Sequence, residues 1–390
     1  MPMIIKQKGF TLVELLAVIV ILGIIMLIVV PTMYSTISAS KTTSVELSAK
    51  FYVDAVEKSA LSKETTSSPI DDGVYQIMNN GNVCLGSLSG NVCSGEILTL
   101  ELNGKEPVSG SILIKNNKVL KIKNLKFDNY YANMSYDEEF SISTTKESSS
   151  ICKAVTSSNK TTGNVPTGSY LTGDEYICNV DGNNEYHFFI LSRDGSLINL
   201  ILDRTIQKSG ELSTDGSNSI TAWLSSSDGS GVTYGPITAF KFLSSATSSW
   251  INISNITINY TYNNYISTGF STSENTVSII KDGISTSSFN NLKSRLPYES
   301  ELKNAGCTET ASSCPLWISN YLYNSETILG GTSISGVHGY WVIPSSLDRN
   351  IPIIDYNGSI VSSLSYLGGA QTDSVVGVRP VISLYEIDLS

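Results

Sequence analysis

A single acidic residue stands inside the most apolar stretch of this chain. Residues 10–30 read FTLVELLAVIVILGIIMLIVV, and Glu14 carries the one charge in this stretch. At about 1.5 Å of rise per helical residue, the stretch spans roughly 30 Å, the hydrocarbon thickness of a bilayer. A carboxylate at that depth is costly and marks a functional candidate. The stretch supplies no cation, so a partner for Glu14 must come from another chain or from a new N-terminus.

Six cysteines offer a second chemistry. An even number of cysteines in an exported chain favours disulfides, although six thiols allow 15 pairings. Pairing between neighbours in the sequence suits the expected hairpins and loops. A zinc site is the alternative, but the chain has no C-x-x-C spacing, and we expect no metal. The expected disulfides are Cys84–Cys93, Cys152–Cys178 and Cys307–Cys314.

Residues typical of catalysis are scarce. The chain has two histidines: His187 lies within an apolar run, and His338 precedes a Gly-Tyr-Trp sequence. The sequence contains no G-x-S-x-G, H-E-x-x-H, P-loop or G-x-G-x-x-G pattern. We therefore expect no catalytic residue, no cofactor and no enzymatic activity.

Composition narrows the class of protein further. The chain has 390 residues, a formal net charge of −10, 41% apolar residues and 15% charged residues. This length indicates two or three domains, and the apolar content excludes a disordered acidic tail. Nucleic-acid binding depends on clustered cations, so the acidic balance argues against it.

The apolar stretch must be helical to carry Glu14. Lys6 and Lys8 precede it and no basic residue follows until Lys41, which places the N-terminus in the cytoplasm if the segment crosses a membrane once. Pro31 ends the apolar run, and a helix kink is expected there. Apolar residues then recur near helical spacing, so an amphipathic second half is predicted as far as residue 62.

Residues 6–16, KQKGFTLVELL, resemble the prepilin-type cleavage and methylation motif of type IV pilins and pseudopilins. The resemblance implies cleavage after Gly9 by a prepilin peptidase and N-methylation of Phe10. It also implies that Glu14 pairs with the Phe10 amine of a neighbouring subunit during assembly. Pro31 resembles the proline around which pilin stalk helices bend. The implied partners are the peptidase, other pilin subunits and the membrane.

The predicted organisation follows from this resemblance and from strand-like patterns. Residues 1–9 form a leader, 10–62 a transmembrane and assembly helix, and 63–147 a small antiparallel β head of pilin type. A hairpin is expected with its tip at Asn116-Asn117. The chain is predicted to be α+β, and its larger C-terminal domain follows.

Residues 148–390 are predicted to form this α+β surface domain, with residues 148–168 as a linker rich in Ser and Thr. Apolar runs at 186–191 and 197–202 indicate two strands joined by a tight turn. Short helices are expected at 287–291 and 298–303, the second just after Pro297.

Parts of this domain resemble sulfatase-modifying-factor-type domains. The resemblance rests on SRLPYESEL at 294–302, Gly-Tyr-Trp at 339–341 and GVRPVI at 377–382. It implies a C-type-lectin-like fold, which has non-catalytic branches used as surface modules. Tyr298 departs from the threonine of the family pattern. Cys307 and Cys314 do not sit in the context of the family's catalytic cysteines, so catalysis is not carried over.

Four charged residues lie in these blocks: Arg295, Glu299, Glu301 and Arg379. We expect them to form buried ion pairs that fix long loops, in preference to a ligand site.

Three hypotheses about function remain. The first is a minor or tip subunit of a type IV pilus or related filament, which displays a C-terminal domain for adhesion to a host or surface glycan or protein. The second is a pseudopilin of a type II secretion or DNA-uptake apparatus. The third is a pilin-anchored surface enzyme or sugar-binding module. On the first hypothesis, the chain lies in the cell membrane before assembly and in the extracellular pilus afterwards.

Overall fold

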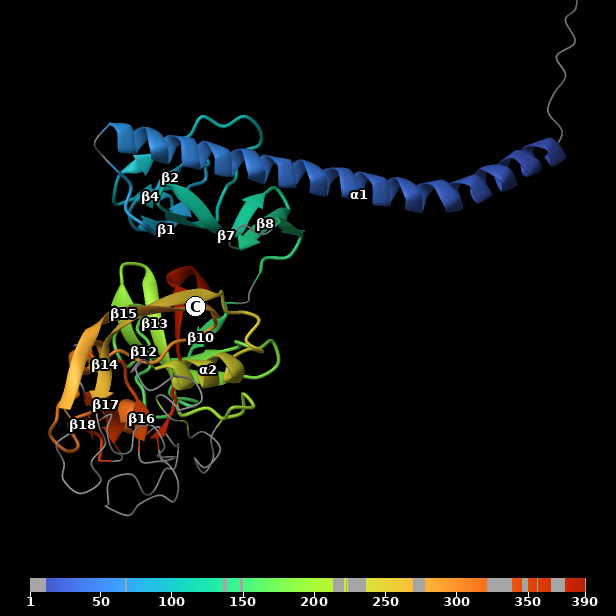
Figure 1. Cartoon of the computed structure of the whole chain (residues 1–390). Helices are drawn as coiled ribbons and strands as arrows, with labels where there is room; N and C mark the ends of the chain where they lie inside the picture. Colours follow the sequence, from blue (N-terminus) through green and yellow to red (C-terminus); the bar gives the residue numbers. More distant parts are fainter. Residues whose placement is uncertain are drawn as a thin grey trace, which may run out of the picture. The chain divides into compact units, whose positions relative to one another are not determined.

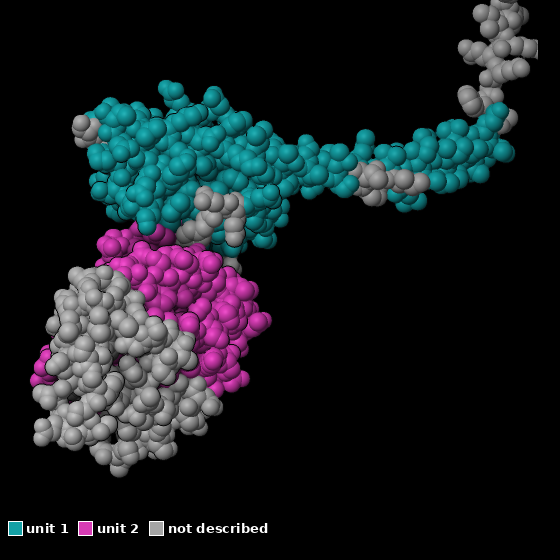
Figure 2. Space-filling view, in the orientation of Figure 1, with its two compact units in different colours: residues 1–148 teal, residues 149–390 magenta. Residues whose placement is uncertain are grey.

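The computed structural model divides the chain into two compact units, residues 1–148 and 149–390 (Figures 1 and 2). The architecture is α+β, with one long N-terminal helix followed by sheets that are mostly antiparallel. The structure describes residues 12–66, 69–135, 139–147, 150–212, 221, 223, 236–268, 278–320, 339–345, 350–355, 357–365 and 376–389.

Unit 1 begins with α1, a single helix from Leu12 to Thr65 that continues through Pro31. Its first turns expose apolar side chains on every side. Leu12, for example, is 81% exposed and Leu27 is 78% exposed. Figure 2 shows this half extending beyond the body of unit 1. Within the described residues, no helix has both the length and the apolarity of a membrane span, so the transmembrane segment expected within 10–62 is not shown.

The second half of α1 packs on a sheet. Its buried residues recur at three- and four-residue intervals, which places them on one face of the helix. The hydroxyl of Tyr52 donates to the carbonyl of Gly81 at 2.9 Å, which satisfies its buried polar atom. The buried residues on this face of α1 are Val45, Ala49, Tyr52, Ala55 and Val56.

The sheet of unit 1 has seven antiparallel strands in the order β5-β2-β1-β6-β7-β8-β9. A separate two-stranded hairpin, β3–β4, completes the unit. The strands are β1 (Gly73–Ile77), β2 (Val83–Cys84), β3 (Leu88–Ser89), β4 (Val92–Cys93), β5 (Ile97–Leu98), β6 (Ser111–Lys115), β7 (Lys118–Phe127), β8 (Tyr130–Ser135) and β9 (Ser141–Ser143).

Two local features shape unit 1. Asn116 and Asn117 form the tip of the β6–β7 hairpin with φ values of 49° and 60°, as a type I′ turn requires. The Cys84–Cys93 disulfide closes the loop that carries β3 and β4. Inside it, a Cβ on Gly86 would lie 2.6 Å from the backbone nitrogen of Gly95, so only glycine permits this approach.

Unit 2 is built around an antiparallel five-stranded sheet in the order β10-β11-β12-β13-β20. A four-stranded sheet follows the order β18-β17-β16-β19, with β16 and β19 parallel. The strands of the two sheets are β10 (Cys152–Ala154), β11 (Glu175–Cys178), β12 (Tyr186–Asp194), β13 (Leu197–Leu202), β16 (Gly339–Trp341), β17 (Asn350–Asp355), β18 (Ile360–Ser365), β19 (Val376–Gly377) and β20 (Val381–Tyr385).

A long ribbon and short helices complete unit 2. In the ribbon, β14 (Ile256–Thr268) pairs with β15 (Ser278–Leu292). The helix expected at 287–291 is therefore wrong, because these residues pair along β15 with residues of β14. The helices are α2 (Ile237–Ala246), α3 (Glu299–Asn304), α4 (Leu316–Ser319) and the 3₁₀ helix η2 (Glu386–Asp388). The helix expected at 298–303 is found as α3.

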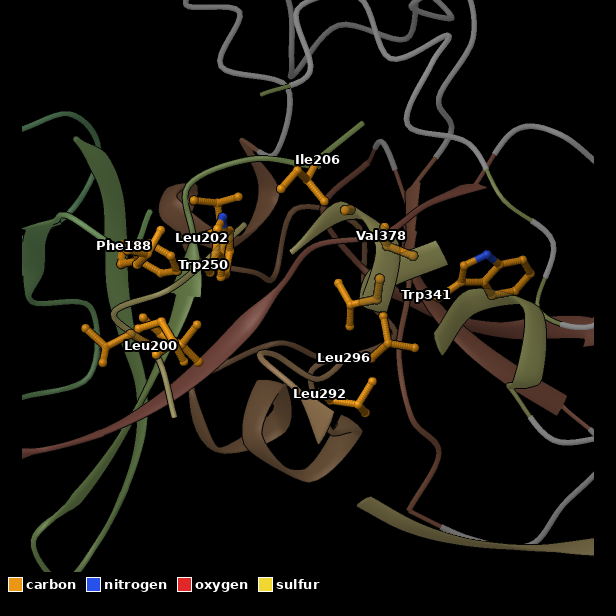
Figure 3. Close-up of a cluster of buried hydrophobic side chains, with 14 of the residues drawn as sticks. Phe188, Leu200, Leu202, Ile206, Trp250, Leu292, Leu296, Trp341 and Val378 are labelled. Atoms are coloured by element: carbon orange, nitrogen blue, oxygen red, sulfur yellow. The ribbon is translucent and has the colours of Figure 1, made fainter. Parts of the chain in front are cut away.

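Apolar side chains cover both faces of the five-stranded sheet. Alternate residues of β12 point to opposite faces, so Phe188 joins one core and Phe189 the other. The larger core gathers Trp250, Trp341 and neighbouring aliphatic residues (Figure 3). The smaller core packs Phe189 against Trp317, with ring centroids 5.7 Å apart.

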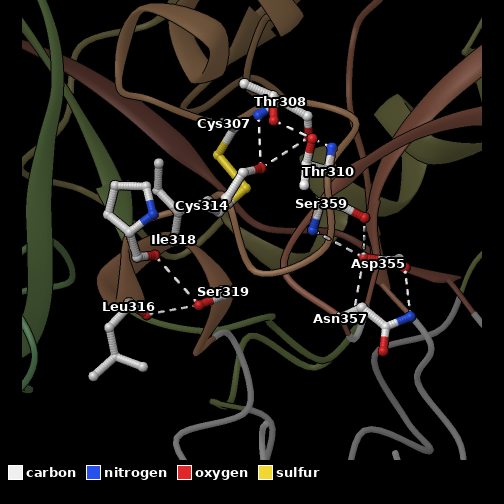
Figure 4. Close-up of a disulfide and its surroundings, with 12 residues drawn as sticks. Cys307, Thr308, Thr310, Cys314, Leu316, Ile318, Ser319, Asp355, Asn357 and Ser359 are labelled. Carbon is white, nitrogen blue, oxygen red and sulfur yellow. Dashed lines mark hydrogen bonds between the residues drawn. A yellow bond between two sulfur atoms is a disulfide. The ribbon is translucent and has the colours of Figure 1, made fainter.

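Two disulfides lie in unit 2, and together with Cys84–Cys93 they coincide with the pairings expected between neighbours in the sequence. Cys152–Cys178 joins opposite residues of β10 and β11. Cys307–Cys314 closes a loop beside the turn after β17 (Figure 4). There, the backbone nitrogen of Cys314 donates to the carbonyl of Gly358 at 3.0 Å.

Candidate functional site

The first candidate region is the start of α1. Gly9 and Phe10, the expected cleavage and methylation positions, lie outside the described residues. Glu14 lies in the first helical turn and is exposed, flanked by the exposed apolar residues Val13 and Leu15. A carboxylate near a helix N-terminus is favoured by the helix dipole. The carboxylate of Glu14 is thus placed on a helical surface that is otherwise apolar.

The N-terminal and C-terminal halves of α1 lie in different environments. The described apolar residues between Leu12 and Val29 are exposed, whereas one face of the helix from Val45 to Val56 packs against the sheet of unit 1. Exposure of a contiguous apolar surface this large marks an interaction site, because folded monomers rarely leave such a surface in water. The kink expected at Pro31 stays a prediction, since the helix is continuous there and the side chain of Pro31 is not described.

The second candidate region is the charged cluster of unit 2. Arg295 Nη1 donates to Oε2 of Glu301 at 2.7 Å, and Nη2 donates to Oε1 at 2.6 Å. Ser192 Oγ, from β12, donates to the same Oε1 at 2.6 Å. Burial would raise the pKa of Glu301, but the hydrogen bonds and charge of Arg295 lower it below its ordinary value. The pair therefore fixes α3 to the central sheet.

The other two residues expected in buried ion pairs differ. Glu299 pairs with Lys303 one helical turn later, at 2.6 Å, and the side chain of Lys303 is about half exposed. It also accepts a hydrogen bond from the backbone of Ser345 at 2.9 Å. Glu299 thus holds the backbone of a loop and pairs with a partly exposed lysine, so it does not form a fully buried ion pair.

Arg379 binds backbone carbonyls, which corrects the expectation of a carboxylate partner. Its side chain is fully buried and donates to four main-chain oxygens from two separate segments. Carbonyl oxygens in loops need donors when water is excluded, and a guanidinium has five. The acceptors are Leu202 at 2.5 Å, Asp203 at 3.2 Å, Trp317 at 2.6 Å and Ile318 at 2.6 Å.

A buried carboxylate that the sequence reasoning missed lies at the start of β11. The side chain of Glu175 is 0% exposed and contacts His187 of β12, with 2.6 Å between Oε1 and Nδ1. Burial would raise the pKa of Glu175, but the hydrogen bonds from His187, Thr161 and Gly163 lower it. Because the ionised carboxylate only accepts, Nδ1 of His187 is the donor. His187 lies on the sheet face, as its position within an apolar run indicated.

Unit 1 contains an open groove of about 580 Å³ between the C-terminal turns of α1 and the β6–β7 hairpin. The hairpin tip closes one side of it: the backbone nitrogen of Asn116 donates to Asp72 at 2.7 Å, and Asn117 Nδ2 donates to Glu64 at 2.6 Å. These carboxylates serve as hydrogen-bond acceptors that hold the hairpin. Among the described residues, no group of three metal-binding side chains is assembled.

Comparison with known proteins assigns a class to the N-terminal segment only. Residues 4–30 match the model described as the prokaryotic N-terminal methylation motif. This is a motif of type IV pilin-like proteins, and the matched segment contains Gly9, Phe10 and Glu14. Such a motif implies processing by a prepilin peptidase and assembly with other pilin subunits.

None of the curated proteins and none of the solved structures matches the chain. The C-type-lectin-like fold expected for unit 2 therefore stays a prediction, as do its ligands.

Proposed function

We propose that this chain is a subunit of a type IV pilus or related filament. The observation that carries the proposal is the change of environment along α1. The helix exposes apolar side chains around its whole circumference over residues 12–27 and then buries one face against unit 1. Neighbouring copies of the same helix, and the membrane before assembly, would remove this apolar surface from water.

Within this proposal, Glu14 recognises a charged group of a neighbouring subunit. Placed among Val13, Leu15 and other apolar residues, its carboxylate would be buried by helix packing and would need a cation. The amine created by cleavage after Gly9 meets this need at Phe10. Pairing of these two charges favours the correct stagger between subunits over other packings.

We further propose that unit 2 is a binding module displayed by a minor or tip subunit. Its 242 residues, 149–390, exceed the 148 residues of unit 1, and a module this large would be repeated at every subunit if the chain were the main component. Its buried charged residues serve packing, which supports binding over catalysis. If purified filaments contain the chain as their dominant, evenly spaced component, the minor-subunit proposal is wrong.

Substitution of Glu14 tests the assembly proposal. In Glu14→Ala, leader removal should proceed normally. The amount of the chain in sheared filaments should fall about tenfold or more, because the charged amine of Phe10 would then be buried without its partner. Glu46→Ala is the matched control, because Glu46 lies in the same helix and pairs with exposed Lys50. Equal incorporation of Glu14→Ala and the wild type would contradict the proposal. Recovery of the chain only in secretion or DNA-uptake complexes would favour a pseudopilin.

A further inference from the structure

Residues 156–173, here called the strap, connect β10 to β11 and lie along one edge of the five-stranded sheet of unit 2. The strap is tied to the sheet by one side chain and by two backbone bonds, from Glu175 N to Asn164 O at 2.9 Å and from Gly173 N to Ile190 O at 2.8 Å. Glu175 accepts hydrogen bonds from Thr161 N at 2.9 Å, Thr161 Oγ1 at 2.9 Å and Gly163 N at 3.0 Å. With His187, four donors converge on one fully buried carboxylate.

Close packing beneath the strap depends on two glycines. A Cβ on Gly163 would lie 2.7 Å from both Glu175 Cβ and Phe189 Cδ1. A Cβ on Gly173, which has φ of +88°, would lie 2.9 Å from Nε1 of Trp317. The strap therefore lies directly on the aromatic pair of Phe189 and Trp317 and shields it from water.

The middle of the strap is held less closely. Gly168 would have nothing within 4 Å of an added Cβ, and the side chain of Leu171 is 56% exposed. The ends are joined by the backbone bond from Asn164 N to Gly173 O at 2.9 Å. Tyr170 packs against the larger core, with its ring centroid 6.5 Å from that of Tyr176, but the rest of this middle stretch makes few buried apolar contacts. Such a segment opens at lower free energy than the sheet beneath it.

We propose that the strap is an acid-released lid over Phe189 and Trp317, held closed by the carboxylate of Glu175. A protonated carboxyl loses its charge and half of its acceptor capacity, so it no longer satisfies four donors. Release of the strap exposes an apolar aromatic surface that is covered at neutral pH. This lid is independent of the filament role proposed above.

The sign of the pH effect follows from the environment of Glu175. Hydrogen bonds lower its pKa below the ordinary value of 4.5, so closure is stabilised above that value and weakens as the pH falls through the lowered pKa. The strap and the strand segments adjoining Glu175 carry these charged or titratable groups: His187, Asp174, Lys160, Lys153, Tyr170, Tyr176, Asp203 and Arg204. Only His187 makes a side-chain contact with the carboxylate among these described groups.

Hydrogen exchange of the intact, processed chain tests the lid. Protection factors, which remove the intrinsic pH dependence of exchange, would be measured for strap and β13 amides from about pH 7 to about pH 3. In the wild type, strap protection should be constant near neutrality and fall in acid while β13 stays protected. Glu175→Gln should lower strap protection roughly 10- to 100-fold at neutral pH and remove its dependence on acid.

A matched pair of substitutions keeps the test valid if Glu175→Gln fails to fold. Thr161→Ala removes one donor to Glu175 and should lower strap protection several-fold, about the value of one hydrogen bond. Thr167→Ala, at an exposed position of the same strap, should leave it unchanged. Unchanged strap protection in Thr161→Ala or Glu175→Gln, or wild-type protection that is flat into acid, would overturn the proposal. Equal loss of protection in β13 would also overturn it, because the unit would then open as a whole.

Discussion

Glu301 accepts hydrogen bonds from Arg295 and from Ser192, residues 6 and 109 positions away along the chain. One carboxylate thus links the loop before α3, the helix itself and the central sheet of unit 2. Asn199 extends the network, since its Nδ2 donates to Ser192 Oγ at 2.9 Å. Networks of this kind are stabilising only while every member keeps its partner.

Removing the charge of Glu301 should therefore destabilise unit 2. In Glu301→Gln, Arg295 is left buried with an incomplete partner, and we expect a loss of about 3 kcal/mol in the free energy of unfolding. Denaturant unfolding of the intact chain measures this. Lys303→Ala is the control: the side chain of Lys303 is about half exposed, so the loss should stay below about 0.5 kcal/mol.

The same carboxylate predicts a pH dependence. The folded state lowers the pKa of Glu301, so its contribution is complete above the ordinary value of 4.5 and is lost as the pH falls below it. The stability difference between the wild type and Glu301→Gln should therefore shrink in acid. A constant difference from neutral pH to about pH 3 would contradict this assignment.

Arg379 should tolerate no replacement, not even by lysine. Arg379→Lys keeps the charge but replaces a planar fork by a single ammonium, which cannot reach the carbonyls of both segments at once. We expect the free energy of unfolding to fall by roughly 3 kcal/mol or more, which would be observed as a lower melting temperature. Arg193→Lys, with a side chain 44% exposed, is the control and should change stability little. Equal effects of the two substitutions would contradict the role of Arg379.

The buried hydroxyl of Tyr52 provides a smaller test in unit 1. Tyr52→Phe keeps the ring in place but leaves the carbonyl of Gly81 without its donor. We expect a loss of about 1 kcal/mol, measured by denaturant unfolding of the intact chain. Phe51→Leu, at the exposed neighbouring position, should have a smaller effect.

The disulfides predict effects confined to their own units. Replacing Cys152 and Cys178 by serine should cost about 3 kcal/mol in unit 2 by the chain-entropy estimate. Replacing Cys84 and Cys93 should instead weaken unit 1. Hydrogen exchange resolved by peptide distinguishes the two cases, and loss of protection in the opposite unit would contradict this expectation.

Local signals explain which elements were predictable. Asn116-Asn117 suits a turn with positive φ, and Pro297 lies two residues before α3, so both features depend on neighbours in the sequence. The residues at 287–291 carry no comparable signal. Their conformation is set by pairing with residues of β14 that lie 27 to 31 positions earlier, and such pairing overrides local propensity.

The candidate functional residues also differ in whether the local sequence identifies them. Glu14 was identifiable because one charge in an apolar run is unusual whatever the fold. The roles of Arg379 and Glu175 were not, because their partners are backbone groups of distant loops or a histidine on the adjacent strand. Every residue type carries a backbone carbonyl, so the sequence does not indicate which carbonyls Arg379 binds. For this reason an ion pair was expected instead.

The Cys152–Cys178 bond also has a mechanical consequence. β10 is the outermost strand of its sheet and the first strand of unit 2, so any pull transmitted from the N-terminal side reaches it first. A strand at a sheet edge would normally peel away one hydrogen bond at a time. Here the covalent bond passes the force directly to β11, which is flanked by strands on both sides. A tethered unit 2 would therefore resist tension by shearing inner strands rather than by unzipping its edge.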